Sequence, residues 1–232
     1  SSANVSHPRS GLGIIDGNPI REDINEVIER FVGPSFLINV IQNPAKEIVG
    51  AVSGHPVAAH AQAAATLDSM CKVDTSVLAD VVIVGCPDPI GINLYQTMNA
   101  MSAPVRVESP VVKLGGHIIV VSRCREGVGH PAFLECVRSS SSVGELHDRV
   151  TRPDEVMLDR YAAQIWAETL LYADVVIVTE GVDPQTLEEM HVRHADTVEQ
   201  ALDMCAQPSG RIGPITAIPD APYVIPHYTG RD

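Results

Sequence analysis

The chain has 232 residues and a formal net charge of -13 at pH 7, and 45% of its residues are hydrophobic. This length and hydrophobic content predict a folded domain with a sizeable core, and the acidic balance argues against a nucleic-acid surface, which needs clustered Lys and Arg. No apolar run reaches the roughly 18 residues of a transmembrane helix, so we expect no membrane partner. The five cysteines have no C-x-x-C spacing, which disfavours a zinc site of that type and is typical of reduced thiols in a cytoplasmic protein.

The first third of the chain predicts a loop, a helix, a hairpin and a second helix. Residues 11–19 are rich in turn formers, and a helix from about Ile20 to Phe31 follows, with apolar residues at helical spacing. Strands are expected at 36–41 and 47–52, on either side of the turn signal Asn43-Pro44. Pro56 then opens an Ala-rich helix that we expect to end near Met70.

The rest of the chain alternates strands and helices. We expect strands at 80–85, 116–122, 175–178 and 214–218, and helices at 92–102, 131–138, 143–150, 154–172, 184–190 and 197–206. Three of these strands carry continuous apolar runs, which are typical of strands covered on both faces. Alternation of this kind implies right-handed crossovers. The predicted fold is therefore α/β, a Rossmann-like doubly wound, mainly parallel sheet with an added amino-terminal β-hairpin.

Three loops follow the predicted buried strands, where open α/β sheets bind their ligands. The first, residues 85–91, leads into a helix whose amino terminus favours an anion and whose first turns carry Asn93, Tyr95 and Gln96. The alternative to a binding role is a structural one, in which Asn93 caps the helix and Tyr95 packs against neighbouring side chains. The second, residues 122–130, carries arginines that would clamp a carboxylate, or else an ion pair between Arg125 and Glu126 with an exposed histidine after it. The third spans residues 179–184.

Other sequence patterns argue against several classes of functional site. His191 and His194 are three residues apart and would share a helical face, for which a solvated surface is favoured over a metal site. No G-x-G-x-x-G follows a strand, and neither G-x-x-x-x-G-K-[ST] nor G-x-S-x-G occurs. Ordinary NAD or ATP sites and an α/β-hydrolase are therefore disfavoured.

Several sequence motifs follow one another along the chain. They are Gly-Asn-Pro-Ile-Arg-Glu-Asp at 17–23, the hairpin stretches 37–41 and 47–60, Ala-Asp-Val-Val-Ile-Val at 79–84, Ile-Asn-Leu-Tyr-Gln at 92–96 and Cys-Arg-Glu-Gly-Val-Gly-His at 124–130. Their order and spacing resemble the carboxy-terminal domain of the nickel-pincer lactate racemase family, whose members are 2-hydroxy-acid racemases. The resemblance places residues 1–232 in that domain, with 1–20 as a boundary segment and the amino-terminal catalytic domain outside this chain.

The resemblance implies a mechanism and a cofactor. The cofactor would be a nickel pincer nucleotide, pyridinium-3,5-bisthiocarboxylic acid mononucleotide nickel, held in a cleft shared with the amino-terminal domain. That domain would supply the tethering lysine and the acid–base histidines, and a small 2-hydroxy acid would exchange a hydride at C2. The alternative is a non-catalytic small-ligand-binding or interaction domain derived from the same family.

The site residues follow from the same resemblance. Tyr95 and Gln96 match the family's Tyr-Gln pair, which lines the cofactor and substrate pocket. Asn99 stands where a lysine is usual, and Tyr161 stands where an aromatic residue, usually Trp, is expected. The matching loop adds Arg125 and Glu126, Asn93 belongs to the matching motif, and His7 is the candidate nickel ligand. Loss of the lysine removes a cation that would hold a carboxylate or phosphate, which favours the alternative.

Overall fold

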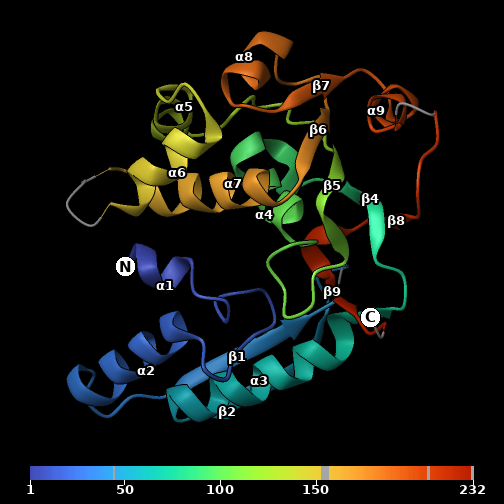
Figure 1. Ribbon diagram of the computed structural model, residues 1–232. Coiled ribbons are helices and arrows are strands. Elements are labelled where there is room, and N and C mark those ends of the chain that lie inside the picture. Colours follow the sequence, from blue (N-terminus) through green and yellow to red (C-terminus); the bar gives the residue numbers. More distant parts are fainter. Residues whose placement is uncertain (44, 153–156, 208–209, 231–232) are drawn as a thin grey trace.

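The computed structural model describes residues 1–43, 45–152, 157–207 and 210–230, arranged in a large and a small lobe (Figure 1). The large lobe is built on a five-stranded parallel sheet of order β7-β6-β5-β4-β8. Its strands are β4 (Ala79–Gly85), β5 (Val112–Val121), β6 (Asp174–Val178), β7 (Arg193–Ala195) and β8 (Ile215–Ile218). The expected apolar runs form its centre, with Val82 opposite Ile118 and both fully buried.

Helices cover both faces of this sheet (Figure 1). They are α4 (Leu94–Ser102), α5 (Pro131–Arg138), α6 (Val143–Thr151), α7 (Arg160–Tyr172), α8 (Pro184–Glu189) and α9 (Val198–Met204). One core packs Phe133 and Trp166 edge-to-face beneath one side of the sheet. A smaller core joins Ile119 to Ala201 of α9 on the other side. The predicted doubly wound α/β class is therefore confirmed.

The small lobe holds the predicted hairpin and its helices. It contains α2 (Pro19–Phe31), β1 (Leu37–Gln42), β2 (Ile48–Gly54) and α3 (Pro56–Cys71). Asn18 caps α2 through its side-chain oxygen, and α3 packs against both strands of the hairpin. β1 and β2 pair antiparallel as a separate two-stranded sheet, so the hairpin lies beside the parallel sheet and not within it.

Short elements complete the chain. They are α1 (Ser2–Val5), β3 (Lys72–Thr75), the 3-10 turns η1 (Ile90–Ile92) and η2 (Ala221–Tyr223), and β9 (Ile225–Tyr228), which pairs in parallel with β3. Sequence periodicity did not predict α1, β3, β7 or β9, because three or four residues show no usable period. Among the described residues, no helix is both long and apolar enough to cross a bilayer.

Two sequence expectations are corrected. His191 and His194 do not share a helix, because the chain leaves α8, turns through His191 at a positive φ of 63°, and continues as β7 with His194 in it. The long helix expected over 154–172 begins at Arg160, after Asp159 in the left-handed region. Residues 154–156 of that expectation lie outside the described residues.

Candidate functional site

The three predicted loops meet at the carboxyl edge of the parallel sheet. A hollow of about 650 Å³ is lined by residues from all three, among them Cys86, Arg123 and Asp183. A neighbouring hollow of about 350 Å³ is lined by the second and third loops and includes Glu126. His194 of β7 lies at the first hollow, where its Nε2 donates to the carbonyl oxygen of Thr179 over 3.1 Å. The edge is therefore hollowed as the strand-end rule predicts.

Backbone hydrogen bonds join the first loop to the second. The N–H groups of Leu94 and Tyr95 donate to the carbonyl oxygens of Gly127 and Val128, each over 3.0 Å. Gly129 has a φ of +88°, and a Cβ there would come within 2.4 Å of Asn93 Cγ. The positive φ and the close approach of the Asn93 side chain therefore favour glycine at position 129, and the two backbone hydrogen bonds fix where α4 begins.

In the first two turns of α4, one polar side chain caps the helix and two others are exposed to solvent. Asn93 Oδ1 accepts from the N–H of Gln96 over 2.9 Å, so the capping role predicted as its alternative is confirmed. Gln96 and Asn99 lie one turn apart and are exposed, and Asn99 Nδ2 donates to the Gln96 carbonyl oxygen over 3.1 Å. Both side-chain amides therefore face solvent on the same side of α4.

Tyr95 lies in a polar cluster that connects three elements. Its hydroxyl is 2.8 Å from the hydroxyl of Tyr161 and donates to Asp159 Oδ1 over 3.5 Å. The second carboxylate oxygen of Asp159 lies 2.7 Å from His130 Nδ1. The ring of His130 is tilted against Tyr95, and Phe133 meets the same ring edge-on. The start of α4, the second loop and the start of α7 are thus joined through one phenol.

The surroundings of Tyr95 raise the pKa of its phenol. Burial, followed by the hydrogen bond with Tyr161, raises the pKa of Tyr95 above its ordinary value, and the charge of Asp159 acts in the same direction. Tyr95 therefore stays protonated at neutral pH. Its O–H donates into the cluster and its oxygen remains an acceptor.

A match to a family model identifies the family. Residues 74–225 match the family model described as the lactate racemase C-terminal domain. The chain belongs to the lactate racemase family.

Two lactate racemases are among the chain's relatives. Those of Thermoanaerobacterium thermosaccharolyticum and Lactiplantibacillus plantarum are each 26% identical, over 224 and 223 residues. Each match covers 95% of this chain and 51% of the relative. The chain therefore spans about half the length of the curated relatives it matches.

Solved structures agree with this assignment. The lactate racemase apoprotein from Thermoanaerobacterium thermosaccharolyticum superposes with a TM-score of 0.86, covering 97% of this chain and 53% of that one. A protein from Thermotoga maritima, 11% identical, superposes at 0.65 over 91% of this chain and 54% of that one, and supports the fold alone.

Within this lactate racemase domain, Arg125 makes an ion pair with the first loop. Arg125 Nη1 is 3.7 Å from Asp88 Oδ2, so the ion pair lies between the first and second loops and not with the adjacent Glu126. Neither hollow at the sheet edge is lined by Tyr95 or Gln96. Of the predicted site residues, Glu126 lines the smaller hollow, whereas Tyr95 and Tyr161 belong to the polar cluster.

His130 and Asp159 were missed as partners of the tyrosines. The sequence predicts His130 in the second loop, with an exposed side chain as the alternative to a binding role, and it predicts no role for Asp159. Asp159 is 64 residues from Tyr95 in the chain, and its left-handed backbone before α7 directs its carboxylate to the cluster. Only the packing of α4 and α7 on one face of the sheet brings these groups together.

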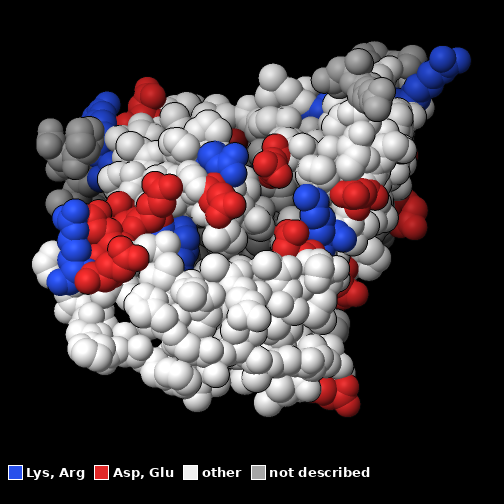
Figure 2. Space-filling view, turned by 90° about the horizontal axis from the view of Figure 1, so that it is seen from below, with Lys and Arg blue, Asp and Glu red and all other residues white. Residues whose placement is uncertain are grey.

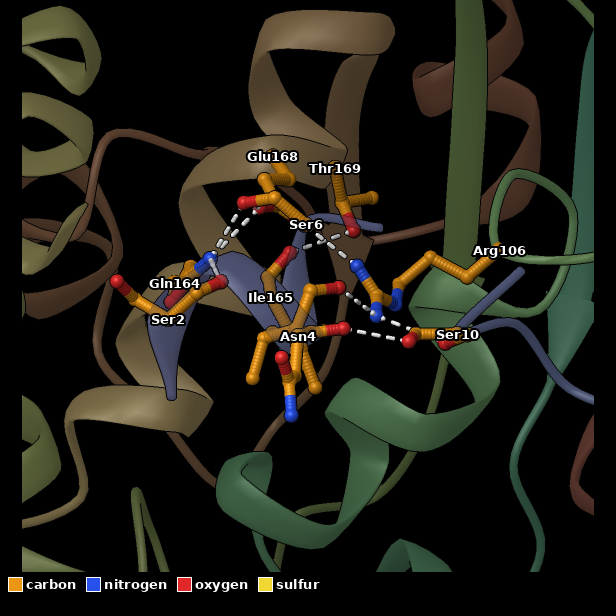
Figure 3. Close-up of polar contacts among 10 residues, drawn as sticks. Ser2, Asn4, Ser6, Ser10, Arg106, Gln164, Ile165, Glu168 and Thr169 are labelled. Atoms are coloured by element: carbon orange, nitrogen blue, oxygen red, sulfur yellow. Dashed lines mark hydrogen bonds and ion pairs between the residues drawn. The ribbon is translucent and has the colours of Figure 1, made fainter. Parts of the chain in front are cut away.

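The amino-terminal segment that contains His7 is held by α7, and Figure 3 shows Gln164 and Glu168 of that helix pointing toward Ser2 and Ser6. The buried Gln164 donates from Nε2 to the carbonyl oxygen of Ser2 over 2.9 Å and to Ser6 Oγ over 2.6 Å. Arg106 pairs with Glu168 over 2.5 Å and donates to two carbonyl oxygens of the segment. His7 itself lines a hollow of about 290 Å³ beside this ion pair. Within the described ranges, no three His, Cys, Asp or Glu side chains are grouped to hold a metal ion.

Proposed function

We propose that this chain is the carboxy-terminal half of a nickel-pincer-dependent 2-hydroxy-acid racemase or epimerase and that its tyrosine cluster lines the cofactor and substrate cleft. One observation carries the proposal. Tyr95 and Tyr161, which stand at the family's pocket positions 66 residues apart, are hydrogen-bonded to each other beside the exposed amide of Gln96.

The available donors fit an organic acid and an oxygen-rich cofactor. Phenol and amide groups donate to carboxylate and phosphate oxygens, and Tyr95, Gln96, Asn99 and Tyr161 present such groups at the starts of α4 and α7. These residues would hold the cofactor's oxygen atoms and orient the substrate hydroxyl, while Asn93 fixes the helix start. They include no metal-ligand set, so on this chain the nickel ligand remains the prediction made for His7.

Chemistry at C2 would come from the bound group. When bound beside Tyr95, Gln96 and Tyr161, the nickel pincer nucleotide would supply the hydride-transfer chemistry at C2 of the substrate. The amino-terminal domain would remove and return the hydroxyl proton. The part of this chain would be to position the substrate and to exclude water, with Tyr95 as a neutral donor.

Asn99, in place of the lysine usual at this position, favours a substrate different from lactate. A neutral amide forms hydrogen bonds roughly half as strong as those of a charged donor, so Asn99 would hold a carboxylate more weakly than the lysine usual at this position. We propose that the preferred acid carries an additional polar group, which Gln96 and Asn99 bind together. The same observation favours the second candidate, a domain that binds a small organic acid without turnover.

The test joins this chain to the amino-terminal half of the Thermoanaerobacterium relative and loads it with the cofactor through the family's maturation enzymes. Optically pure 2-hydroxy acids deuterated at C2 are incubated with it and separated by chiral chromatography. We expect racemisation with the deuterium retained, and a loss of at least about tenfold (about 1.4 kcal/mol) in kcat/KM for Gln96→Ala. Gln185→Ala, an exposed amide on α8, is the matched control.

Asn99→Lys separates the candidates. It should raise kcat/KM for lactate by about tenfold if the missing cation limits binding. A loaded protein that binds the acids but racemises none of them, with or without this substitution, supports the non-catalytic domain and contradicts the racemase.

A further inference from the structure

Asp159 precedes α7 but does not cap it. Aspartate is among the residues that most often accept a hydrogen bond from the first turn of a helix, yet the side chain of Asp159 makes none with α7. Its backbone has a φ of 54°, in the left-handed region, which is strained for a residue with a side chain. Its Oδ2 lies instead 2.7 Å from Nδ1 of His130, at the start of α5. Because such strain is concentrated at functional sites, the position of this carboxylate indicates a role in the tyrosine cluster.

The carboxylate sets the direction of the hydrogen-bond relay formed by Asp159, Tyr95 and Tyr161. The Tyr95 hydroxyl lies 3.5 Å from Asp159 Oδ1 and 2.8 Å from the Tyr161 hydroxyl, and each phenol has one proton to donate. A carboxylate can only accept, and the Asp159 side chain is 16% exposed, so its oxygen depends on a proton from the protein. If Tyr95 donated to Tyr161 instead, its lone pairs would face the negative charge. Tyr95 therefore donates to Asp159, and Tyr161 donates to Tyr95.

Tyr161 is the end of the relay that a ligand can reach. It is 52% exposed, whereas Tyr95 packs against the rings of His130 and Phe133. Because its one proton is donated to Tyr95, the oxygen of Tyr161 presents lone pairs and no donor. A ligand hydroxyl can donate to it, whereas a carbonyl or carboxylate oxygen cannot.

We propose that Asp159, held by His130, is a positioning residue and that Tyr161 determines specificity by accepting a hydrogen bond from the hydroxyl of a 2-hydroxy acid. The 2-oxo acid with the same carbon skeleton has no proton to donate at C2, so the site disfavours it. The amides of Gln96 and Asn99 remain to donate to the carboxylate of the ligand. The inference rests on the proposed function in naming this class of ligand, whereas the direction of the relay does not depend on it.

Charge does not make this distinction. The arginines of the second loop are already paired, Arg123 with Glu180 over 3.4 Å and Arg125 with Asp88 over 3.7 Å. Figure 2 shows the same arrangement on the face that it views, where most Lys and Arg side chains lie beside Asp or Glu. A cation would also attract hydroxy acids and oxo acids alike, since both carry the carboxylate. Discrimination between them therefore depends on the hydrogen-bond donors and acceptors of the site.

NMR tests the direction of the relay without ligand or cofactor. The chain is labelled with a carbon isotope at tyrosine Cζ, whose resonance moves downfield when the hydroxyl donates a hydrogen bond and upfield when it accepts one. Tyr95→Phe should move the Tyr161 resonance upfield, because Tyr161 loses the acceptor for its proton. A downfield movement would show that Tyr95 donates to Tyr161 and would overturn the proposal.

Asp159→Asn tests the positioning role in the same experiment. An uncharged partner lets Tyr95 donate to Tyr161, so the Tyr161 resonance should move although Tyr161 itself is unchanged. Asp148→Asn, which removes the same charge from an exposed residue of α6, is the matched control and should leave that resonance in place. An equal effect of the two variants would overturn the positioning role. If Asp159→Asn fails to fold, Tyr95→Phe still decides the direction of the relay.

The specificity is tested with the chain joined to the amino-terminal half of the Thermoanaerobacterium relative and loaded with the cofactor. Calorimetry compares lactate with pyruvate, and 2-hydroxyglutarate with 2-oxoglutarate. We expect each hydroxy acid to bind about tenfold more tightly than its oxo acid. Tyr161→Phe and Asp159→Asn should each reduce this ratio to less than about threefold, whereas a general disturbance of the structure would weaken both acids and leave the ratio unchanged.

Two binding results would overturn the proposal. They are a ratio that both variants leave unchanged, and tighter binding of the oxo acids to the unsubstituted protein. If none of the acids binds while the Tyr161 resonance moves as expected, the proposed function is contradicted and the direction of the relay is confirmed.

Discussion

Tyr95 and Tyr161 form the most specific contact of the candidate site, and its strength is measurable without substrate. Their hydroxyl groups are 2.8 Å apart, with Tyr95 largely buried against His130 and Phe133. We expect Tyr95→Phe and Tyr161→Phe each to lower the free energy of unfolding by about 1 kcal/mol, with a coupling of about 0.5–1 kcal/mol in the double variant. Urea unfolding measures all three. Fully additive losses would contradict a direct hydrogen bond.

Cys86 predicts a dependence of stability on alkaline pH. Burial raises the pKa of its thiol from 9.0 to about 11. Between these values the unfolded chain loses the proton while the folded chain keeps it, so stability is complete below pH 9 and falls as the pH rises to about 11, by about 2 kcal/mol. Cys86→Ala should flatten this part of a pH series of urea unfolding curves. An unchanged slope relative to the unsubstituted chain would refute the assignment.

At the scale of elements, α4 depends on its cap. Asn93 accepts from the N–H of Gln96, whereas Asn99 on the same helix makes only an exposed contact with the backbone. We expect Asn93→Ala to lower the unfolding free energy by about 1 kcal/mol or more, and Asn99→Ala to change it by less than about 0.5 kcal/mol. Thermal and urea unfolding of the two variants compare them directly. Equal effects would show that the cap contributes nothing.

The clamp between α7 and the amino-terminal segment is the second element-scale prediction. Arg106 and Glu168 are only 16% and 18% exposed, and Glu168 also accepts from Ser6 (Figure 3). Glu168→Gln leaves the guanidinium with a neutral partner, so we expect a loss of about 2–3 kcal/mol and faster proteolysis within residues 1–10. Glu135→Gln, which removes an exposed i,i+3 pair, is the control. Unchanged cleavage of the segment would contradict the clamp.

At the scale of the whole molecule, the two lobes should differ in stability. Both buried cores belong to the parallel sheet and its helices, while α2 has no buried residue and α3 buries only Ala59 and Ala63. In the chain alone, amides of residues 19–71 should therefore exchange at least about tenfold faster than those of β4, β5 and β6. Native-state hydrogen exchange with mass spectrometry measures this. Equal protection of both lobes would mean that they unfold as one cooperative unit.

Local sequence signals determined the elements and their order. Val81 to Val84 and Val175 to Ile177 could only be covered strands, and the turn at Asn43 with its flanking apolar runs specified a hairpin whose strands the structure shifts by one or two residues. The loops after the strands were identifiable because parallel strands carry their ligands at one edge. The family was identifiable because its motifs occur in a fixed order.

Tertiary structure decided the contacts between distant segments. The pairing of Tyr95 with Asp159 and of Arg125 with Asp88, the strand conformation of His194 and the separate sheet of the hairpin depend on how α4, α7 and the strands pack. These interactions join residues that are far apart in the sequence and belong to no common periodic pattern. Sequence periodicity indicates which face of an element is buried. Which other element packs against that face is set by the free energy of packing the whole fold.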